Sequence, residues 1–179
     1  MVDSTDAKNY LVQRIKSYVD VSESLKGQIL ERTTVRKIAN DRNLSLYEDD
    51  HFFVAEGILK KENQDNQDIA HFIVEGQFGI FPSECSRYSF IGMENCKIVV
   101  MRQENLDYLL AQNQSLLPAY RRFLFEWAMQ RIWRTELLLL PAAEAKAVLL
   151  KRLGKFANRI SNKDLAAYLS VNTSYYSTI

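Results

Sequence analysis

The amino-acid sequence predicts an α+β fold, in which short N-terminal helices precede an antiparallel β-roll and a long helix leads to a C-terminal helix-turn-helix. Three observations carry this prediction. Residues 33–101 contain short β-branched and aromatic runs separated by polar turns. Helical spacing of apolar residues precedes this block and returns after Glu104. Two helix-capping signals follow each other closely within residues 160–179.

Composition and targeting signals are typical of a globular protein. The 179 residues, 47% hydrophobic and 25% charged, suffice for one or two domains with a sizeable core. No apolar run is long enough to span a bilayer, and the N-terminus lacks the basic flank and apolar core of a signal peptide. We therefore expect a cytoplasmic protein without a membrane partner.

Signatures of metal binding and catalysis are missing from the pattern. Cys85 and Cys96 lack CxxC spacing, and His51 and His71 lie far apart in the sequence, so we expect buried free thiols, no metal site and no cofactor. An enzyme of the cupin type would need a His-x-His pair. No nucleophile with a neighbouring base stands out either, so we expect no catalytic residues and no enzyme.

The first elements are expected to be helical. Apolar residues between Tyr10 and Val19 share one helix face, and Ser22 opens a second short helix that carries Leu25 and Ile29.

The β-block has the strand spacing of a compact antiparallel barrel or roll. Gly57, Gly76, Gly79 and Gly92 fall at strand junctions, where a positive φ favours glycine. The polar run 60–68 is expected to form an exposed hairpin tip. The predicted strands are residues 33–38, 44–47, 51–54, 58–60, 71–74, 88–91 and 97–101.

A long helix is predicted over residues 116–140, with Pro118 in its first turn. A helix that is apolar on more than one side must be covered on more than one side. This favours a homodimer, although an intramolecular sandwich would provide the same cover. Pro141 separates the long helix from another that carries apolar residues up to Phe156. The dispersed apolar residues of the long helix are Tyr120, Phe123, Leu124, Trp127, Ile132 and Trp133.

The last stretch has the pattern of two helices joined by a tight turn. Ser161 can cap the first helix, and Asn172 or Thr173 can cap the second. The small Ala166 suits a close crossing of the two helices, and Val171 is expected to fill the corner between them. These features fit a helix-turn-helix and also fit an ordinary surface helical hairpin.

Charge separates the two parts of the chain. From Leu117 onward ten basic residues accompany four acidic ones, whereas the preceding part is acidic in balance. Because phosphate contacts dominate the affinity of proteins for nucleic acid, a basic C-terminal part favours DNA as its partner.

With this order of elements, the chain resembles the catabolite-activator, or Crp/Fnr, family of bacterial transcription regulators over nearly its whole length. The similar stretches are residues 51–57 (HFFVAEG), 72–79 (FIVEGQFG), 86–101 (SRYSFIGMENCKIVVM) and 141–150 (PAAEAKAVLL). The resemblance implies a cyclic-nucleotide-binding-like jelly-roll domain over residues 1–115, a dimerisation helix over 116–140, and a helix-turn-helix domain over 141–179. It also implies regulation of transcription through a near-palindromic double-stranded DNA operator.

The resemblance places an effector pocket at Phe78, Gly79, Ser86, Arg87 and Tyr88. Nucleotide-binding relatives use a Gly-Glu pair for the ribose and an arginine for the cyclic phosphate. Here Ile80 follows Gly79, Ser86 takes the arginine position, and Arg87 is one residue out of register, which turns its side chain to the opposite face. We expect a degenerate pocket that does not bind cyclic AMP. It could be empty, filled by Phe78, Phe81 or Tyr88, or tuned to another small-molecule effector.

The resemblance also assigns the DNA contacts. Asn162 and Lys163 would hold a phosphate, and the groove would be faced by Thr173, Ser174, Tyr175 and Thr178, with Tyr176 in the core. Ser170 replaces the glycine of the family's turn. The sequence stops at Ile179, partway through the family's recognition helix, so a truncated DNA-binding unit is expected. The alternative is a ligand-binding or scaffolding module that has lost DNA binding.

Overall fold

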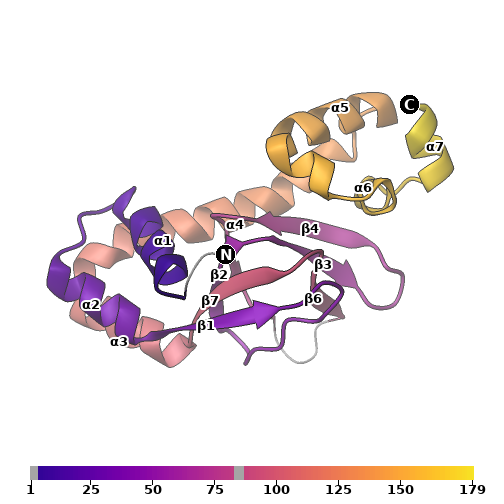
Figure 1. Ribbon diagram of the computed structural model, residues 1–179. Coiled ribbons are helices and arrows are strands. Elements are labelled where there is room, and N and C mark those ends of the chain that lie inside the picture. Colours follow the sequence, from indigo (N-terminus) through magenta and orange to yellow (C-terminus); the bar gives the residue numbers. More distant parts are fainter. Residues whose placement is uncertain (1–3, 83–86) are drawn as a thin grey trace.

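The computed structural model describes residues 4–82 and 87–179 and shows a β-roll flanked by helices at both ends of the chain (Figure 1). The elements are α1 (Ser4–Lys16), α2 (Glu23–Glu31), β1 (Thr33–Ile38), β2 (His51–Glu56), β3 (Ile58–Asn63), β4 (Ile69–Val74), β5 (Phe78–Ile80), β6 (Tyr88–Gly92), β7 (Cys96–Met101), α3 (Gln103–Gln112), η1 (Gln114–Leu116), α4 (Leu117–Leu137), α5 (Ala142–Leu153), η2 (Gly154–Arg159), α6 (Asn162–Tyr168) and α7 (Thr173–Thr178).

The roll consists of two antiparallel sheets that enclose one hydrophobic interior. Its four-stranded sheet has the order β1-β7-β2-β5, and its three-stranded sheet has the order β4-β3-β6. The interior is filled by large side chains from both sheets, among them Phe52, Leu59, Ile73 and Phe90. The α+β prediction with an antiparallel roll is therefore confirmed.

Helices cover the outer face of the four-stranded sheet. Phe53 of β2 and Val99 of β7 point outward into a cluster formed with Leu11 of α1 and Ile29 of α2. The ring of Tyr10 meets Phe53 edge to face, with centroids 5.1 Å apart. The first turn of α2 is capped by Ser22, whose hydroxyl accepts from the Leu25 N–H at 3.2 Å, as the sequence predicted.

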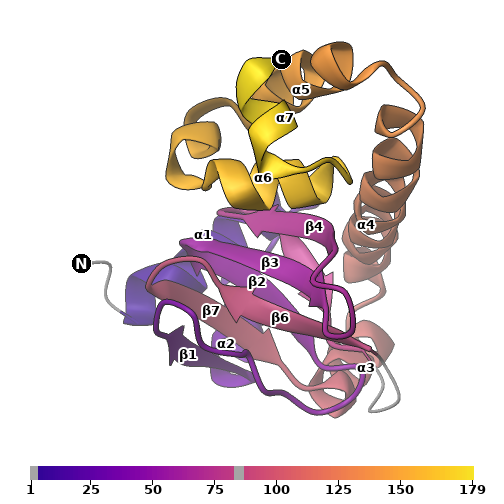
Figure 2. The ribbon, with the colours of Figure 1, turned by 90° about the vertical axis from the view of Figure 1, so that its right-hand side faces the viewer.

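The C-terminal helices cover the outer face of the three-stranded sheet, and we call residues 142–178 the C-terminal unit. In Figure 2 these helices lie directly above β4, and α4 connects them to the rest of the chain. Phe72 projects from β4 into a cluster with Leu149 of α5, Leu165 of α6 and Tyr176 of α7. Strands β3 and β4 therefore bury side chains on both faces of the three-stranded sheet.

The structure differs from the sequence-based expectation in several elements. The strand predicted over residues 44–47 is wrong: next to β6 this part of the chain makes only an isolated bridge between Asn43 and Ile91 and a hydrogen bond from the Leu44 N–H to the Phe90 carbonyl at 2.8 Å. The short strand β5 was not predicted. The long helix ends at Leu137, and Phe156 lies in η2 after α5 has ended.

The junction glycines serve two different physical purposes. Gly57 and Gly76 have φ angles of 98° and 85°, which confirms the expected left-handed backbone at these two corners. Gly79 has no such backbone. It is required by packing, because a Cβ there would lie 2.2 Å from Cζ of Phe52.

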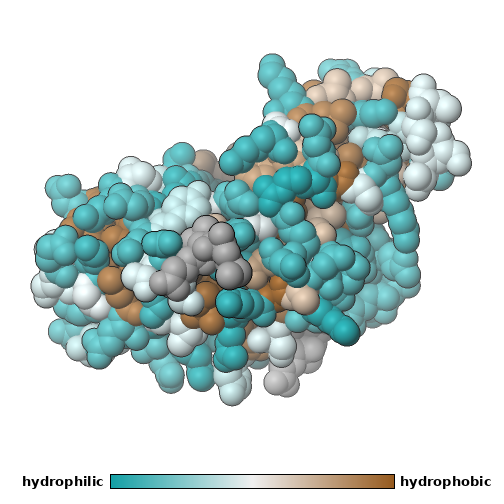
Figure 3. Space-filling view, in the orientation of Figure 1, coloured by the Kyte–Doolittle hydropathy of each residue, from teal (hydrophilic) through white to brown (hydrophobic). Residues whose placement is uncertain are grey.

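The surface in the view of Figure 1 is largely hydrophilic, with hydrophobic side chains gathered near the C-terminal unit and near the N-terminal helices (Figure 3). Within the described ranges, every helix is too short or too polar to cross a membrane.

Replacing Gly79 with alanine should destabilise the roll by about 1–3 kcal/mol, because Phe52 must leave its position to admit the methyl group. The matched control is Gly27→Ala on the exposed side of α2, where a Cβ meets no atom within 4 Å. That change should stabilise by about 0.5–1 kcal/mol, the difference in helix propensity. Urea denaturation measures both, and equal effects of the two substitutions would contradict the packing role of Gly79.

Candidate nucleic-acid interface and ligand site

The helix pair α6–α7 is built by two local caps and a shared core. The Ser161 hydroxyl accepts from the Asp164 N–H at 3.1 Å, and Oδ1 of Asn172 accepts from the Tyr175 N–H at 2.7 Å. Ala166 is completely buried and Tyr176 is 1% exposed. The predicted capping residues and the predicted core tyrosine are confirmed.

The turn between the two helices forms without glycine. Ser170 has a φ of 55°, a left-handed conformation that costs a non-glycine residue roughly 1–2 kcal/mol. The turn is held by backbone hydrogen bonds from the Ser170 N–H to the Ala167 carbonyl at 3.1 Å and from the Val171 N–H to the Ala166 carbonyl at 3.0 Å. Val171 packs against the cluster of the C-terminal unit.

The end of α7 is held by Lys146 of α5. Its ammonium donates to the carbonyls of Tyr176 at 2.8 Å and Ile179 at 2.6 Å, and it lies 4.3 Å from the centroid of the Tyr176 ring. A cation at the C-terminal end of a helix satisfies carbonyls that have no partner within the helix. The short α7 is therefore fixed at both ends, by Asn172 and by Lys146.

The residues predicted to contact DNA are all exposed. Tyr175 is 47% exposed, and its neighbours on α7 project with it away from the core. Thr178 donates its hydroxyl to the Tyr175 carbonyl at 2.8 Å, which leaves its oxygen free to accept. The exposed set consists of Asn162, Lys163, Thr173, Ser174, Tyr175 and Thr178.

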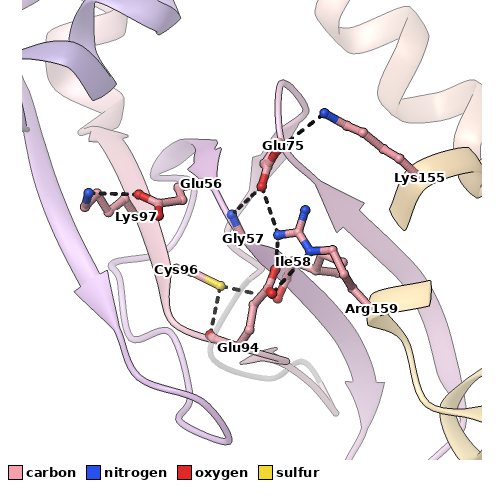
Figure 4. Close-up of polar contacts among 9 residues, drawn as sticks. All are labelled: Glu56, Gly57, Ile58, Glu75, Glu94, Cys96, Lys97, Lys155 and Arg159. Atoms are coloured by element: carbon pink, nitrogen blue, oxygen red, sulfur yellow. Dashed lines mark hydrogen bonds and ion pairs between the residues drawn. The ribbon is translucent and has the colours of Figure 1, made fainter. Parts of the chain in front are cut away.

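An arginine in η2 joins the C-terminal unit to three corners of the roll (Figure 4). The guanidinium of Arg159 donates to Glu75 at 2.9 Å and also binds Glu94. Glu75 in turn accepts from the Gly57 N–H at 3.1 Å. Burial by itself would raise the pKa of Glu75, but the Gly57 N–H and the Arg159 guanidinium outweigh it and lower the pKa. The charged, docked form is thus favoured at neutral pH.

Further ion pairs flank the hydrophobic contact between the roll and the C-terminal unit. Lys60 of β3 lies 3.1 Å from Asp164 of α6. Arg134 of α4 pairs with Asp68 at 2.9 Å and donates to the Tyr168 carbonyl at 3.2 Å. Sequence reasoning missed Arg134 and Arg159, because both act on partners more than thirty positions away.

The inside of the roll at the predicted effector pocket is occupied by aromatic side chains. Phe52 lies directly over Gly79, and Phe81 packs against Phe90 with centroids 6.0 Å apart. Phe78 points out of the roll, where it stacks on Phe123 of α4 at 3.9 Å and packs on Phe53 at 4.8 Å. Three aromatic residues were candidates for filling the interior of the roll: Phe78, Phe81 and Tyr88. Of these, Phe81 packs against the hydrophobic cluster inside the roll.

The polar effector candidates do not converge on the interior. Arg87 has a side chain that is 78% exposed and pairs with Asp65 of the β3–β4 hairpin at 3.2 Å. Tyr88 lies near Lys61, whose ammonium is 4.9 Å from the ring centroid. Ser86 lies outside the described residues. In the described part of the chain, no group of three or more His, Cys, Asp or Glu side chains is placed to hold a metal ion.

The exposed face of α4 carries large apolar side chains. The sequence did not predict which apolar residues of this helix are exposed and which are buried. Phe125, Met129 and Ile132 are 54%, 38% and 49% exposed. Phe123 and Trp133 instead turn toward Phe78 and Tyr168 of the same chain. The spacing of four and three residues from Phe125 to Ile132 is the signal that could have identified this stripe.

Comparisons with known proteins agree with the fold. No protein-family model and no curated protein matches the chain. Among solved structures it is similar to a cyclic nucleotide-binding domain containing protein from Listeria monocytogenes EGD-e, with a TM-score of 0.70 and 14% identity, covering 96% of this chain and 87% of that one. It is also similar to FixK2 from Bradyrhizobium japonicum, with a TM-score of 0.68 and 14% identity, covering 82% and 81%.

A third similar structure is described as a transcriptional regulator of the Crp/Fnr family, from Eubacterium rectale ATCC 33656. Its TM-score is 0.65 at 10% identity, with 89% of this chain and 82% of that one covered. At such identities the likeness establishes the fold. The chain has the β-roll and helical architecture of Crp/Fnr-type regulators and cyclic-nucleotide-binding proteins.

Proposed function

We propose that this protein is a dimeric DNA-binding transcription regulator of the Crp/Fnr type. The observation that carries the proposal is the pair α6–α7, in which a capped helix exposes a row of polar side chains above the buried Tyr176. This pair follows a roll and a long helix in the order found in regulators of this fold. We assign residues 1–115 to the roll domain, 116–140 to the dimerisation helix, and 141–179 to the DNA-binding domain.

In this assignment the two helices have different tasks. Lys163 on α6 supplies a positive charge for a backbone phosphate, and Asn162 supplies a neighbouring amide. Thr173, Ser174, Tyr175 and Thr178 on α7 face the major groove. Short hydroxyl side chains make single contacts to base edges, so each contributes less discrimination than a bidentate arginine would.

Replacing Lys163 with alanine should weaken DNA binding about equally on all sequences and reduce the salt slope by about one, because one phosphate contact is lost. Thr178→Val should instead change which sequence is preferred. The measurement is a titration of a selected and a scrambled duplex at several salt concentrations. Lys37→Ala on β1 is the control, since it removes the same charge from an exposed position remote from α6–α7. If the wild-type chain does not bind either duplex, or binds with an affinity that does not depend on salt concentration, the proposal is contradicted.

The dimer contact is proposed on the exposed stripe of α4. Phe125, Met129 and Ile132 recur at the spacing of a coiled-coil seam, and all three remain accessible while the opposite side of α4 packs on the roll. Large apolar side chains gathered on one accessible face are typical of a protein interface. A second copy of α4 would supply matching apolar side chains.

The double substitution Phe125→Glu and Ile132→Glu should convert a dimer into a folded monomer, because two charges would be buried at the seam. Sedimentation velocity measures the mass, and circular dichroism verifies the fold. Tyr108→Glu, at another exposed aromatic position that is 47% accessible, should leave the mass unchanged. A wild-type chain that sediments as a monomer at micromolar concentration would refute the dimer.

The roll is proposed not to bind cyclic AMP. Ile80 provides no acceptor for a ribose hydroxyl, and Arg87 is turned away from the interior toward Asp65. The space beside Gly79 is taken by Phe52. The cation nearest to this interior is Lys61, whose ammonium lies 5.6 Å from the centroid of the Phe90 ring. Burial and the charge of Arg131 lower the pKa of Lys61 to about 8, which weakens it as a partner for a phosphate.

Calorimetry with cyclic AMP and cyclic GMP should show no binding tighter than about 1 mM, which corresponds to about 4 kcal/mol. Adenosine serves as the uncharged control for nonspecific heat. A micromolar dissociation constant that disappears in Arg87→Ala would overturn this expectation.

One observation favours the second candidate, a ligand-binding or scaffolding module. The described residues of α7, 173–178, include no lysine or arginine, whereas major-groove helices commonly read guanine with such side chains. The titration in salt separates the two candidates, because a module without DNA binding would show no salt-dependent affinity for any duplex.

A further inference from the structure

A cavity of about 430 Å³ lies between the roll and the C-terminal unit. Its walls come from α1, from β4 and the turn after it, from α4, from α5 and η2, and from α6. A volume of this size falls within the range of small-molecule pockets. The cavity is separate from the interior of the roll, since its β4 wall includes the outward-facing Phe72 and Val74.

One side of the cavity is aromatic. The rings of Phe72 and Tyr168 are stacked with centroids 5.0 Å apart and an interplanar angle of 26°. Trp133 lies 6.5 Å from Tyr168, and its ring is also part of the wall. A flat apolar molecule can therefore pack against several ring faces at once.

Two polar groups that line the cavity have no hydrogen-bond partner among the described residues. Tyr168 is only 4% exposed, and its hydroxyl has no partner among the described residues. The guanidinium of Arg152 lies 3.8 Å from the centroid of Trp133, with no carboxylate at ion-pair distance in the described part of the chain. These two groups are left to water or to a ligand, and a ligand that displaces the water must replace its hydrogen bonds. His71 also borders the cavity, but its side chain shares the sheet face of Lys61 and Phe90, opposite to Phe72.

The protonation states of these groups favour donors. Burial raises the pKa of Tyr168 to about 12, so its hydroxyl keeps its proton at neutral pH. Burial, followed by the charges of Arg131, Lys61, Arg134 and Arg152, lowers the pKa of His71 to about 3, so the ring is neutral. The Tyr168 hydroxyl is therefore the donor, and the neutral ring of His71 brings no charge.

The charges around the cavity favour an anion. The acidic side chain in the wall, Glu75, is already bound by Arg159 and by the Gly57 N–H. Arg14 is paired with Glu126 at 3.0 Å. Arg152 is left as a wall cation without a carboxylate partner in the described residues, and Arg131 and Lys61 add positive potential behind His71. A cation would be repelled from the same place.

We propose that this cavity binds a small aromatic anion, with its ring against Trp133 and Tyr168 and its carboxylate or phosphate held by Arg152 and the Tyr168 hydroxyl. Arg152 and Tyr168 belong to the C-terminal unit, whereas Phe72 of the aromatic wall belongs to the roll. An occupant therefore ties α5 and α6 to β4. Any effect of the occupant on DNA affinity rests on the proposed function, but the binding itself does not.

The probe is 2-naphthoate, and its neutral isostere 2-naphthamide is the control ligand. Binding is measured by calorimetry on the wild-type chain and by the fluorescence of Trp133 in a Trp127→Phe background. We expect saturable binding of naphthoate and binding of naphthamide at least about tenfold weaker, since a charge-assisted hydrogen bond is lost. Fluorescence of Trp133 should change on binding, because its ring lines the cavity.

Variants locate the site. Arg152→Gln should weaken naphthoate binding by about tenfold or more, and it should reduce the difference in affinity between naphthoate and naphthamide. Tyr168→Phe keeps the stacked ring, removes only the hydroxyl and should weaken naphthoate selectively. Lys151→Gln, which removes the same charge from the adjacent exposed position on α5, should leave both affinities unchanged.

The proposal would be overturned if naphthoate and naphthamide bound with equal affinity. It would also be overturned if naphthoate binding were unchanged in both Arg152→Gln and Tyr168→Phe. The naphthoate titrations contain no DNA, so they test the ligand site independently of the proposed function. If the chain binds naphthoate but fails to bind DNA, only the proposal of a transcription regulator is refuted. If it binds DNA but not naphthoate, only the proposal of this ligand site is refuted.

Discussion

The structure depends on the burial of both faces of strands β3 and β4. Adjacent residues of β4 serve different cores, with Phe72 projecting outward and Ile73 inward, and β3 repeats the arrangement with Ile58 and Leu59. A sheet covered on both sides requires successive apolar residues instead of strict alternation. Full burial of one such side chain contributes about 1.5–3 kcal/mol. The outward residues thereby hold the C-terminal unit on the roll, and the inward residues hold the roll together.

Charged contacts then fix where the C-terminal unit lies on this sheet. Lys60 reaches Asp164, Arg134 reaches Asp68, and Arg159 reaches Glu75. Partly exposed pairs of this kind contribute little energy individually, about 0–1 kcal/mol each. They are directional, however, and they connect particular corners of the roll to particular helices. The apolar contact supplies most of the attraction, and the ion pairs select one docked position, in which α7 remains exposed.

The same docking gives the molecule a cavity outside the roll while the roll interior is filled. Gly79, which the family resemblance assigned to an effector pocket, makes room for Phe52 in this chain. Polar groups without a hydrogen-bond partner in the described ranges lie instead at the junction, where Arg152 and Tyr168 of the C-terminal unit line one cavity with Phe72 of the roll. A ligand at this junction would contact both parts directly, whereas a ligand inside the roll would act on α6 only through β3 and β4.

The sequence by itself determined the features that depend on near neighbours. Ser22, Ser161 and Asn172 cap their helices within three residues, the strand periodicity identifies most of the roll, and Tyr176 falls in the core by helical spacing. The order of these elements was enough to predict the fold. Tertiary structure decided the rest, because the outcome depended on residues distant in the sequence. It turned Phe78 out of the roll onto Phe123 and left residues 44–47 outside the strands of the roll. It also brought His71, Arg152 and Tyr168 to one cavity, since helix packing on a sheet is set by shape and burial over the whole surface and no local pattern encodes it.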